Sequence, residues 1–179
     1  MAVSGIIIAG GASRRMGQDK ALLQVAGKTQ LDRTQAILRE AGCEQVIVSR
    51  NAEGFIVDKI AGRGPLGGLL SVLPHCVHDT LMLVPVDMPL LSSAALQFLL
   101  GYEGAGYFAS SSLPCVLPNV PELGDYLTRQ LCDDGGDRSV RGMLNWLGAH
   151  AHEWPYSYQL QNTNTPQQWQ RALTLLGEQ

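Results

Sequence analysis

Three basic side chains follow a pair of glycines near the start of this 179-residue chain. Gly10 and Gly11 are adjacent, and Arg14, Arg15 and Lys20 come within ten residues of them. Glycines let a backbone approach a ligand and turn its N–H groups toward phosphate oxygens, and the cations add further donors. The alternative is a simple turn with solvated surface charges. We favour a triphosphate site, at which attack on the α-phosphorus would release pyrophosphate.

A carboxylate is expected to face the same ligand. Asp87 follows an apolar stretch and lies between Pro85 and Pro89, which restrict the backbone on both sides. Proteins usually hold Mg2+ with one or two carboxylates and the phosphates of the substrate, so Asp87 is the candidate metal ligand. Asp87 could instead cap the next helix, but Ser92 and Ser93 are better placed for that role.

Two further segments could contribute to a binding site. The stretch Gly64-Pro-Leu-Gly-Gly68 opens a predicted helix, and its glycines would let the backbone pass close to a base or ribose, although packing alone could explain the segment. The stretch Asn162-Thr-Asn-Thr-Pro166 has a local explanation, because Asx and Thr side chains before a proline satisfy the first N–H groups of a helix. A capping role and a site role for Asn162 and Asn164 are compatible.

Strands and helices alternate along the first hundred residues. Apolar runs predict strands over 5–9, 46–48 and 81–84, and helical spacing predicts helices over 31–41 and 66–73 and from Ser92 or Ser93 to Leu100. This alternation indicates an α/β sheet with largely parallel strands. Ligands of such sheets collect at the carboxyl ends of the strands, where the glycine pair and Asp87 are expected.

The pattern is less regular beyond Gly101. Short strands are predicted at 107–109 and 115–117, and helices near 123–131 and 139–147. A final helix is predicted to begin with Thr165 as its N-cap and Pro166 as its first residue. Because the sequence contains no repeat, low-complexity tract or linker, we expect one domain over residues 1–179.

Composition and charge argue against several classes of protein. The chain is 45% hydrophobic with a net charge of −3, so it should be globular and should lack the basic field that nucleic-acid binding requires. No apolar run reaches the roughly 20 residues of a membrane span, and no signal peptide is recognisable, which predicts a cytoplasmic protein. Zinc is not expected, because the four cysteines form no C-x-x-C and His75 and His78 lack a third ligand at usable spacing. The other two histidines, His150 and His152, are assigned to a loop.

The stretch Ile7-Ile-Ala-Gly-Gly-Ala-Ser-Arg-Arg-Met-Gly-Gln-Asp-Lys20 resembles the opening signature of the molybdenum cofactor guanylyltransferases, which join GMP from GTP to molybdopterin. The segments Leu83-Val-Pro-Val-Asp-Met-Pro89 and Asn162 to Pro166 resemble two further family segments in the same order. The resemblance implies a single three-layer Rossmann-like nucleotidyltransferase domain with a mostly parallel mixed sheet. It also implies Mg2+ as cofactor, GTP and molybdopterin as substrates, and a cofactor-delivery or molybdoenzyme chaperone protein as a further partner.

The same resemblance implies roles for individual residues. The implied catalytic groups are Arg15, Lys20 and Asp87, of which Asp87 also holds Mg2+. The implied nucleotide site comprises Ile8, Ala9, Gly10, Gly11, Lys20, Ser49, Asn51, Asp58, Gly64, Pro65 and Asp87. On the acceptor side the resemblance implies Asn162 and Asn164, with Arg138 or Arg141 for the acceptor phosphate. A helix N-terminus with surface arginines would explain the last two equally well.

Other functions remain open. A cytidylyltransferase, or an enzyme acting on another phosphorylated metabolite, would keep the phosphate and metal residues and differ in its base and acceptor pockets. A non-catalytic nucleotide-binding partner in cofactor assembly is favoured only by the segment 101–118, which is shorter than its counterpart in the family. Retention of both Lys20 and Asp87 argues against a protein that binds without turnover.

Overall fold

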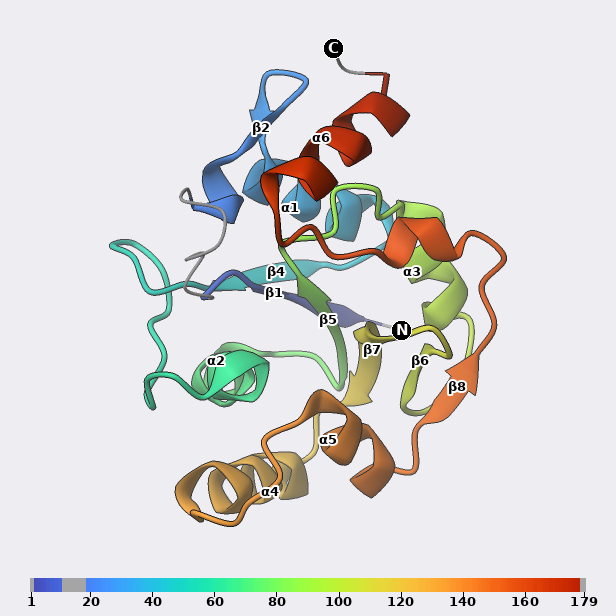
Figure 1. The fold of residues 1–179 in the computed structure, drawn as a ribbon. Helices are drawn as coiled ribbons and strands as arrows, with labels where there is room; N and C mark the ends of the chain where they lie inside the picture. The colour runs from blue at the N-terminus through green and yellow to red at the C-terminus, as the bar shows by residue number, and fades with distance from the viewer. Residues whose placement is uncertain (1, 11–18, 178–179) are drawn as a thin grey trace.

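The computed structural model describes residues 2–10 and 19–177, which fold around a six-stranded sheet (Figure 1). The strand order is β4-β1-β5-β7-β6-β8. The strands are β1 (Val3–Ile8), β4 (Gln45–Ser49), β5 (Thr80–Pro85), β6 (Gly106–Phe108), β7 (Ser111–Pro118) and β8 (His150–His152). Strand β1 pairs in parallel with β4 and β5, and β6 pairs in parallel with β8, whereas β7 is antiparallel to β5 and β6. The predicted mixed and mostly parallel sheet is therefore confirmed.

Helices cover both faces of this sheet and complete three layers (Figure 1). One face carries α1 (Gln30–Glu40), α3 (Ser93–Leu100) and α6 (Pro166–Leu175), and the other carries α2 (Gly64–Val72), α4 (Pro121–Cys132) and α5 (Val140–Trp146). Three short 3-10 helices, η1 (Lys20–Leu22), η2 (Leu73–His75) and η3 (Ser157–Leu160), lie in the connections. This is the predicted Rossmann-like α/β arrangement.

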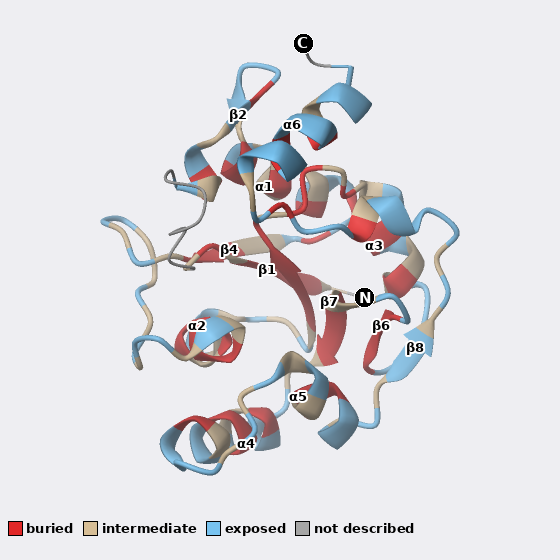
Figure 2. Cartoon of the chain, in the orientation of Figure 1, coloured by how far each residue is buried: buried red, intermediate tan, exposed pale blue. Residues whose placement is uncertain are grey.

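The central strands are buried on both sides (Figure 2). Ile7 and Val84 belong to the core under α1 and α3, while Ile6 and Leu83, one residue earlier in each strand, belong to the core under α2, α4 and α5. Side chains alternate across a strand, so a strand covered on both faces must be apolar throughout. This requirement explains why β1 and β5 read as continuous hydrophobic runs.

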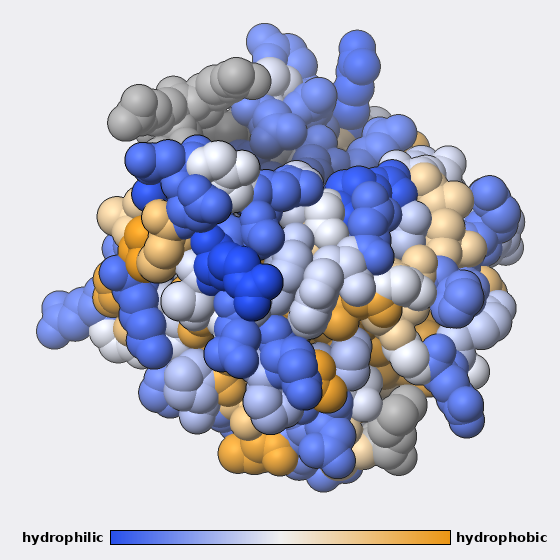
Figure 3. Space-filling view, turned by 90° about the horizontal axis from the view of Figure 1, so that it is seen from below, coloured by the Kyte–Doolittle hydropathy of each residue, from blue (hydrophilic) through white to orange (hydrophobic). Residues whose placement is uncertain are grey.

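The outer surface of the helical layers differs from their buried sides. Helix α4 buries Leu123, Leu127 and Leu131 on one side. Seen from the side of α4 and α5, the molecule is mainly hydrophilic, with hydrophobic side chains scattered among polar ones (Figure 3). Among the described helices, none combines the length and the apolar character that crossing a membrane would require.

Some elements differ from the sequence prediction. Assignment of His150 and His152 to a loop was wrong, because they form β8, an edge strand whose pairing with β6 is made by the backbone. A small hairpin of β2 (Gln24–Val25) and β3 (Lys28–Thr29) was also not predicted. Its turn uses positive φ angles at Ala26 and Gly27. Both elements are too short to show a periodic pattern.

Candidate active site

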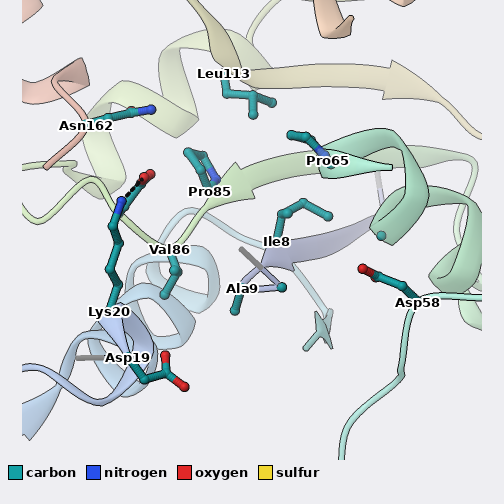
Figure 4. A pocket seen from close by; sticks show the side chains of 14 residues that line it. Ile8, Ala9, Asp19, Lys20, Asp58, Pro65, Pro85, Val86, Leu113 and Asn162 are labelled. Atoms are coloured by element: carbon teal, nitrogen blue, oxygen red, sulfur yellow. Dashed lines mark hydrogen bonds and ion pairs between the residues drawn. The ribbon is translucent and has the colours of Figure 1, made fainter. Parts of the chain in front are cut away.

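A cavity of about 220 Å³ opens at the carboxyl ends of β1 and β5 (Figure 4). These two strands are parallel neighbours, so the segments that follow them emerge side by side at one edge of the sheet. The cavity is lined by Ile8, Ala9, Gly10, Asp19, Lys20, Asp58, Gly64, Pro65, Gly68, Pro85, Val86, Asp87, Leu113 and Asn162. Chain segments from both ends of the sequence therefore meet here.

An ion pair crosses one side of the cavity. The Nζ of Lys20 lies 3.0 Å from Oδ2 of Asp87 and donates a second hydrogen bond of 2.7 Å to Oδ1 of Asn164. Thr163 fixes the backbone between them, because its N–H and its hydroxyl both donate to the carbonyl oxygen of Asp87, at 2.8 and 3.2 Å. The segment before α6 is thus tied to the loop that follows β5.

Asp87 keeps one oxygen free of these contacts. Its Oδ1 is buried and has no hydrogen-bond partner in the described part of the chain. A buried carboxylate oxygen without a donor is unfavourable unless another group satisfies it, and a divalent cation is such a group. No group of three or more His, Cys, Asp or Glu side chains gathers within the described ranges, so Asp87 would need phosphate oxygens or water to complete a coordination shell.

A second carboxylate stands across the cavity from this pair (Figure 4). Asp58 accepts hydrogen bonds from the hydroxyl of Ser49, at 3.2 Å, and from Nδ2 of Asn51, at 3.0 Å. The Oδ1 of Asn51 in turn accepts from the N–H of Asp58, at 2.8 Å, so the carboxylate is held in one orientation. Gly10 passes beside it, since a Cβ built at this position would lie 3.4 Å from Asp58 Oδ2.

The start of α2 closes the same side of the cavity. Gly64 has a φ of +62°, and Pro65 follows within the first turn of α2. Gly68 lets α2 lie directly against the sheet, because a Cβ there would stand 2.7 Å from the Oγ of Ser49 and 3.1 Å from Cδ1 of Ile8. The close approach brings the helix N-terminus next to the ends of β1 and β4.

The structure brings most of the expected nucleotide residues to the cavity, including Ile8, Ala9, Gly10, Lys20, Asp58, Gly64, Pro65 and Asp87. Ser49 and Asn51 support Asp58 instead of forming the cavity wall. Gly11, Arg14 and Arg15 lie outside the described residues.

The expected acceptor residues fall in two places. Asn162 lines the cavity and Asn164 binds Lys20. The two arginines make other contacts: Arg141 donates a 2.6 Å hydrogen bond to the hydroxyl of Tyr107 and lies over its ring, and Arg138 donates to the carbonyl oxygen of Asp133. Neither arginine is among the residues that line the cavity.

Sequence reasoning assigned no role to some residues of the cavity. Asp19 stands next to Lys20 in the glycine-rich segment, and that neighbourhood was a usable signal. Leu113 carried no comparable signal, because its place depends on the antiparallel pairing of β7 with β5.

Gly10 and the Lys20–Asp87 pair lie in one cavity at the carboxyl edge of the sheet. A family model described as MobA-like NTP transferase domain matches residues 5–141, and the chain belongs to this family. The chain is 40% identical to a molybdenum cofactor guanylyltransferase of Xanthomonas euvesicatoria pv. vesicatoria, covering 95% of this chain and 94% of the relative. It is 29% identical to a protein of the same name from Shewanella sp. (strain MR-4), over 98% of both chains.

Solved structures share the fold. The molybdopterin-guanine dinucleotide biosynthesis protein A of Archaeoglobus fulgidus superimposes with a TM-score of 0.75 at 19% identity, covering 97% of this chain and 98% of that one. The 2-C-methyl-D-erythritol 4-phosphate cytidylyltransferase of Thermus thermophilus superimposes with a TM-score of 0.70 at 18% identity, over 98% of both chains. Because proteins named for different substrates have this fold, the fold alone does not select the base.

Proposed function

We propose that this nucleotidyltransferase transfers GMP from GTP to molybdopterin, releasing pyrophosphate and forming the guanine dinucleotide cofactor. The observation that carries the proposal is the Lys20–Asp87 pair in the cavity, in a chain that is 40% identical to a protein named for this activity. A cofactor-delivery or molybdoenzyme chaperone protein would then bring the acceptor or receive the product.

The nucleotide would bind between Gly10 and α2. Gly10 leaves the backbone after β1 open to phosphate oxygens, and the ammonium of Lys20 is within the same cavity. Arg15 would add a second cation that stabilises charge developing on the phosphates. The oriented carboxylate of Asp58, with Ser49 and Asn51 behind it, would face the ribose or base, and Gly64 and Pro65 would flank it.

A divalent cation, Mg2+, is proposed at Asp87, whose unpartnered Oδ1 fits it. When bound, this ion would neutralise the negative charge of the phosphates. Lys20 already has a second partner in Asn164, so its ammonium could leave Asp87 without losing every hydrogen bond. No covalent enzyme intermediate is required, because an acceptor phosphate is ionised near neutral pH and can attack the α-phosphorus directly.

The acceptor is proposed to enter on the side of Asn162, opposite Asp58 (Figure 4). Asn162 and Asn164 would orient it with their amide groups. Arg141 would contact its phosphate only if the acceptor extended toward β6, since Arg141 is bound to Tyr107. Arg138 would do so only if the acceptor reached the end of α4, where Arg138 is bound to the carbonyl oxygen of Asp133.

The test is pyrophosphate release from GTP and from CTP, with Mg2+ and molybdopterin, by the intact protein and by Asp87→Ala. GTP-selective release that is lost in Asp87→Ala is expected. The matched control is Asp125→Ala, which removes an exposed carboxylate from α4 and should leave the rate unchanged. Selectivity for CTP would reassign the protein to cytidylyl transfer, and tight GTP binding without release would reassign it to a non-catalytic partner.

A further inference from the structure

Asp19 connects the segment that carries Lys20 to the end of β4. One carboxylate oxygen, Oδ1, accepts a 3.0 Å hydrogen bond from the N–H of Ala21 and so caps η1, in which Lys20 is the first residue. The other oxygen, Oδ2, lies 2.8 Å from Nη2 of Arg50, the residue that directly follows β4. Both oxygens are therefore used to fix the backbone around Lys20.

Arg50 is itself held from several directions. Its guanidinium lies 5.1 Å from the centroid of the Phe55 ring, and its side chain is only 11% exposed. Its N–H donates to the carbonyl oxygen of Ile56, and its carbonyl oxygen accepts from Ala52. Phe55 packs against the core beneath α1 and α3, so the ring that contacts the guanidinium is itself held in place.

The two side chains of the Asp19–Lys20 dipeptide have different directions (Figure 4). Lys20 extends toward the side of Asn162, while Asp19 points away from it toward Arg50. The backbone between them is thus fixed from opposite sides, by Arg50 through Asp19 and by Asp87 and Asn164 through Lys20.

We propose that Arg50 is a positioning residue for Lys20, acting through Asp19. This inference rests on the proposed nucleotide transfer and adds to it a residue outside the cavity wall. Arg50 has two effects. It fixes the cap of η1 and hence the origin of the Lys20 side chain, and it neutralises a carboxylate that lines the cavity. Without Arg50, Asp19 would present an unpaired negative charge to a triphosphate.

The first variant for the test is Arg50→Met, which keeps an unbranched side chain over Phe55 and removes the charge. We expect KM for GTP in pyrophosphate release to rise roughly tenfold, because a charge-assisted hydrogen bond is lost and a repulsive charge is exposed, with a smaller change in kcat. Arg50→Lys should recover only part of the affinity, since an ammonium lacks the planar guanidinium that stacks on the ring. The control is Arg129→Met, an exposed arginine of α4, with no expected change.

A double variant separates the effect of the exposed Asp19 charge from a general loss of stability. Asp19→Asn keeps an oxygen that can cap Ala21 and removes the unpaired charge, so Arg50→Met combined with Asp19→Asn should bind GTP more tightly than Arg50→Met alone. Thermal unfolding shows whether each variant is folded, and direct GTP titration then measures its affinity. An unchanged KM in folded Arg50→Met, or a double variant that binds no better than the single one, would overturn the inference. Absence of pyrophosphate release by the intact protein from every nucleotide would instead refute the proposed function, while GTP titration would still report on Arg50.

Discussion

Lys20 and Asp87 form an ion pair with 3.0 Å between Nζ and Oδ2, although 67 positions separate them in the sequence. Their side chains are only 15% and 17% exposed, so water screens the pair weakly. A lysine in this place occupies one oxygen of the carboxylate that we propose as the metal ligand. The ammonium and a divalent cation would therefore compete for Asp87.

This competition predicts the behaviour of Lys20→Met. Without nucleotide, the variant should bind Mn2+, used as a probe, about tenfold more tightly than the intact protein. Removing Lys20 frees Oδ2 of Asp87 for the metal ion and takes away a neighbouring positive charge. Pyrophosphate release should fall by roughly a hundredfold or more, because a cation that faces the phosphates is gone. Calorimetric titration and a rate assay measure the two effects, with Lys28→Met in the exposed β2–β3 hairpin as control. Unchanged Mn2+ affinity would argue against competition at Asp87.

The packing of α2 on the sheet predicts opposite effects of one substitution at two glycines. Gly68→Ala should destabilise the protein by about 1 to 3 kcal/mol, because the new methyl group would lie 2.7 Å from the Oγ of Ser49. Gly124→Ala in α4 meets nothing within 4 Å and should stabilise by roughly 0.5 to 1 kcal/mol. Urea unfolding of both variants checks the prediction. Equal effects would mean that α2 moves to accommodate the methyl group.

The first turn of α6 provides a third test. Thr165 caps this helix reciprocally with Gln168, whose side chain also accepts a 2.7 Å hydrogen bond from the N–H of Asn164. Thr165→Ala should lower the free energy of unfolding by about 1 kcal/mol. It should also lower the rate of pyrophosphate release, because Asn164 binds Lys20. Thr174→Ala, on the exposed side of the same helix, should change the free energy of unfolding by no more than about 0.5 kcal/mol and should leave the rate unchanged. A rate unaffected by Thr165→Ala would show that Asn164 does not depend on the cap.

The sequence predicted those parts of the fold in which burial determines composition. Strands β1, β4 and β5 were predicted because the core requires apolar residues there. Strand β8 and the β2–β3 hairpin were not, because two or three residues held by backbone pairing impose no pattern on their side chains. Local patterns could therefore identify the sheet but not its edge.

For the site, sequence reasoning reached the residues that follow strands directly. Asp87 and Gly10 were expected at the carboxyl edge, and the structure places both in the cavity. The hydrogen bond from Lys20 to Asn164 joins residues 144 positions apart, so the local spacing of residues in the sequence could not predict it. The contact of Arg141 with Tyr107 likewise depends on how α5 lies on β6, which no local motif records.

Thiol reactivity provides the last prediction. Cys43 and Cys115 are buried, Cys76 is half-buried and Cys132 is exposed. Burial raises the pKa of the Cys43 thiol to about 11, and it raises that of Cys115 as well. The thiolate is the reactive form, and a pKa two units above the usual 9.0 lowers its population at pH 8 by about a hundredfold.

At pH 8 a disulfide reagent such as dithionitrobenzoate should therefore modify Cys132 rapidly and the buried thiols slowly. Reactivity of Cys43 should increase as the pH rises toward its raised pKa, since deprotonation is what burial opposes. Cys132→Ser should remove the fast phase, and denaturant should make every remaining thiol react quickly. Because the half-buried Cys76 could also react, the decisive variant replaces both Cys76 and Cys132 by serine. A fast phase that persists in this double variant would mean that the layer over Cys43 or Cys115 opens readily, because reagent and hydroxide could reach those thiols only through local unfolding.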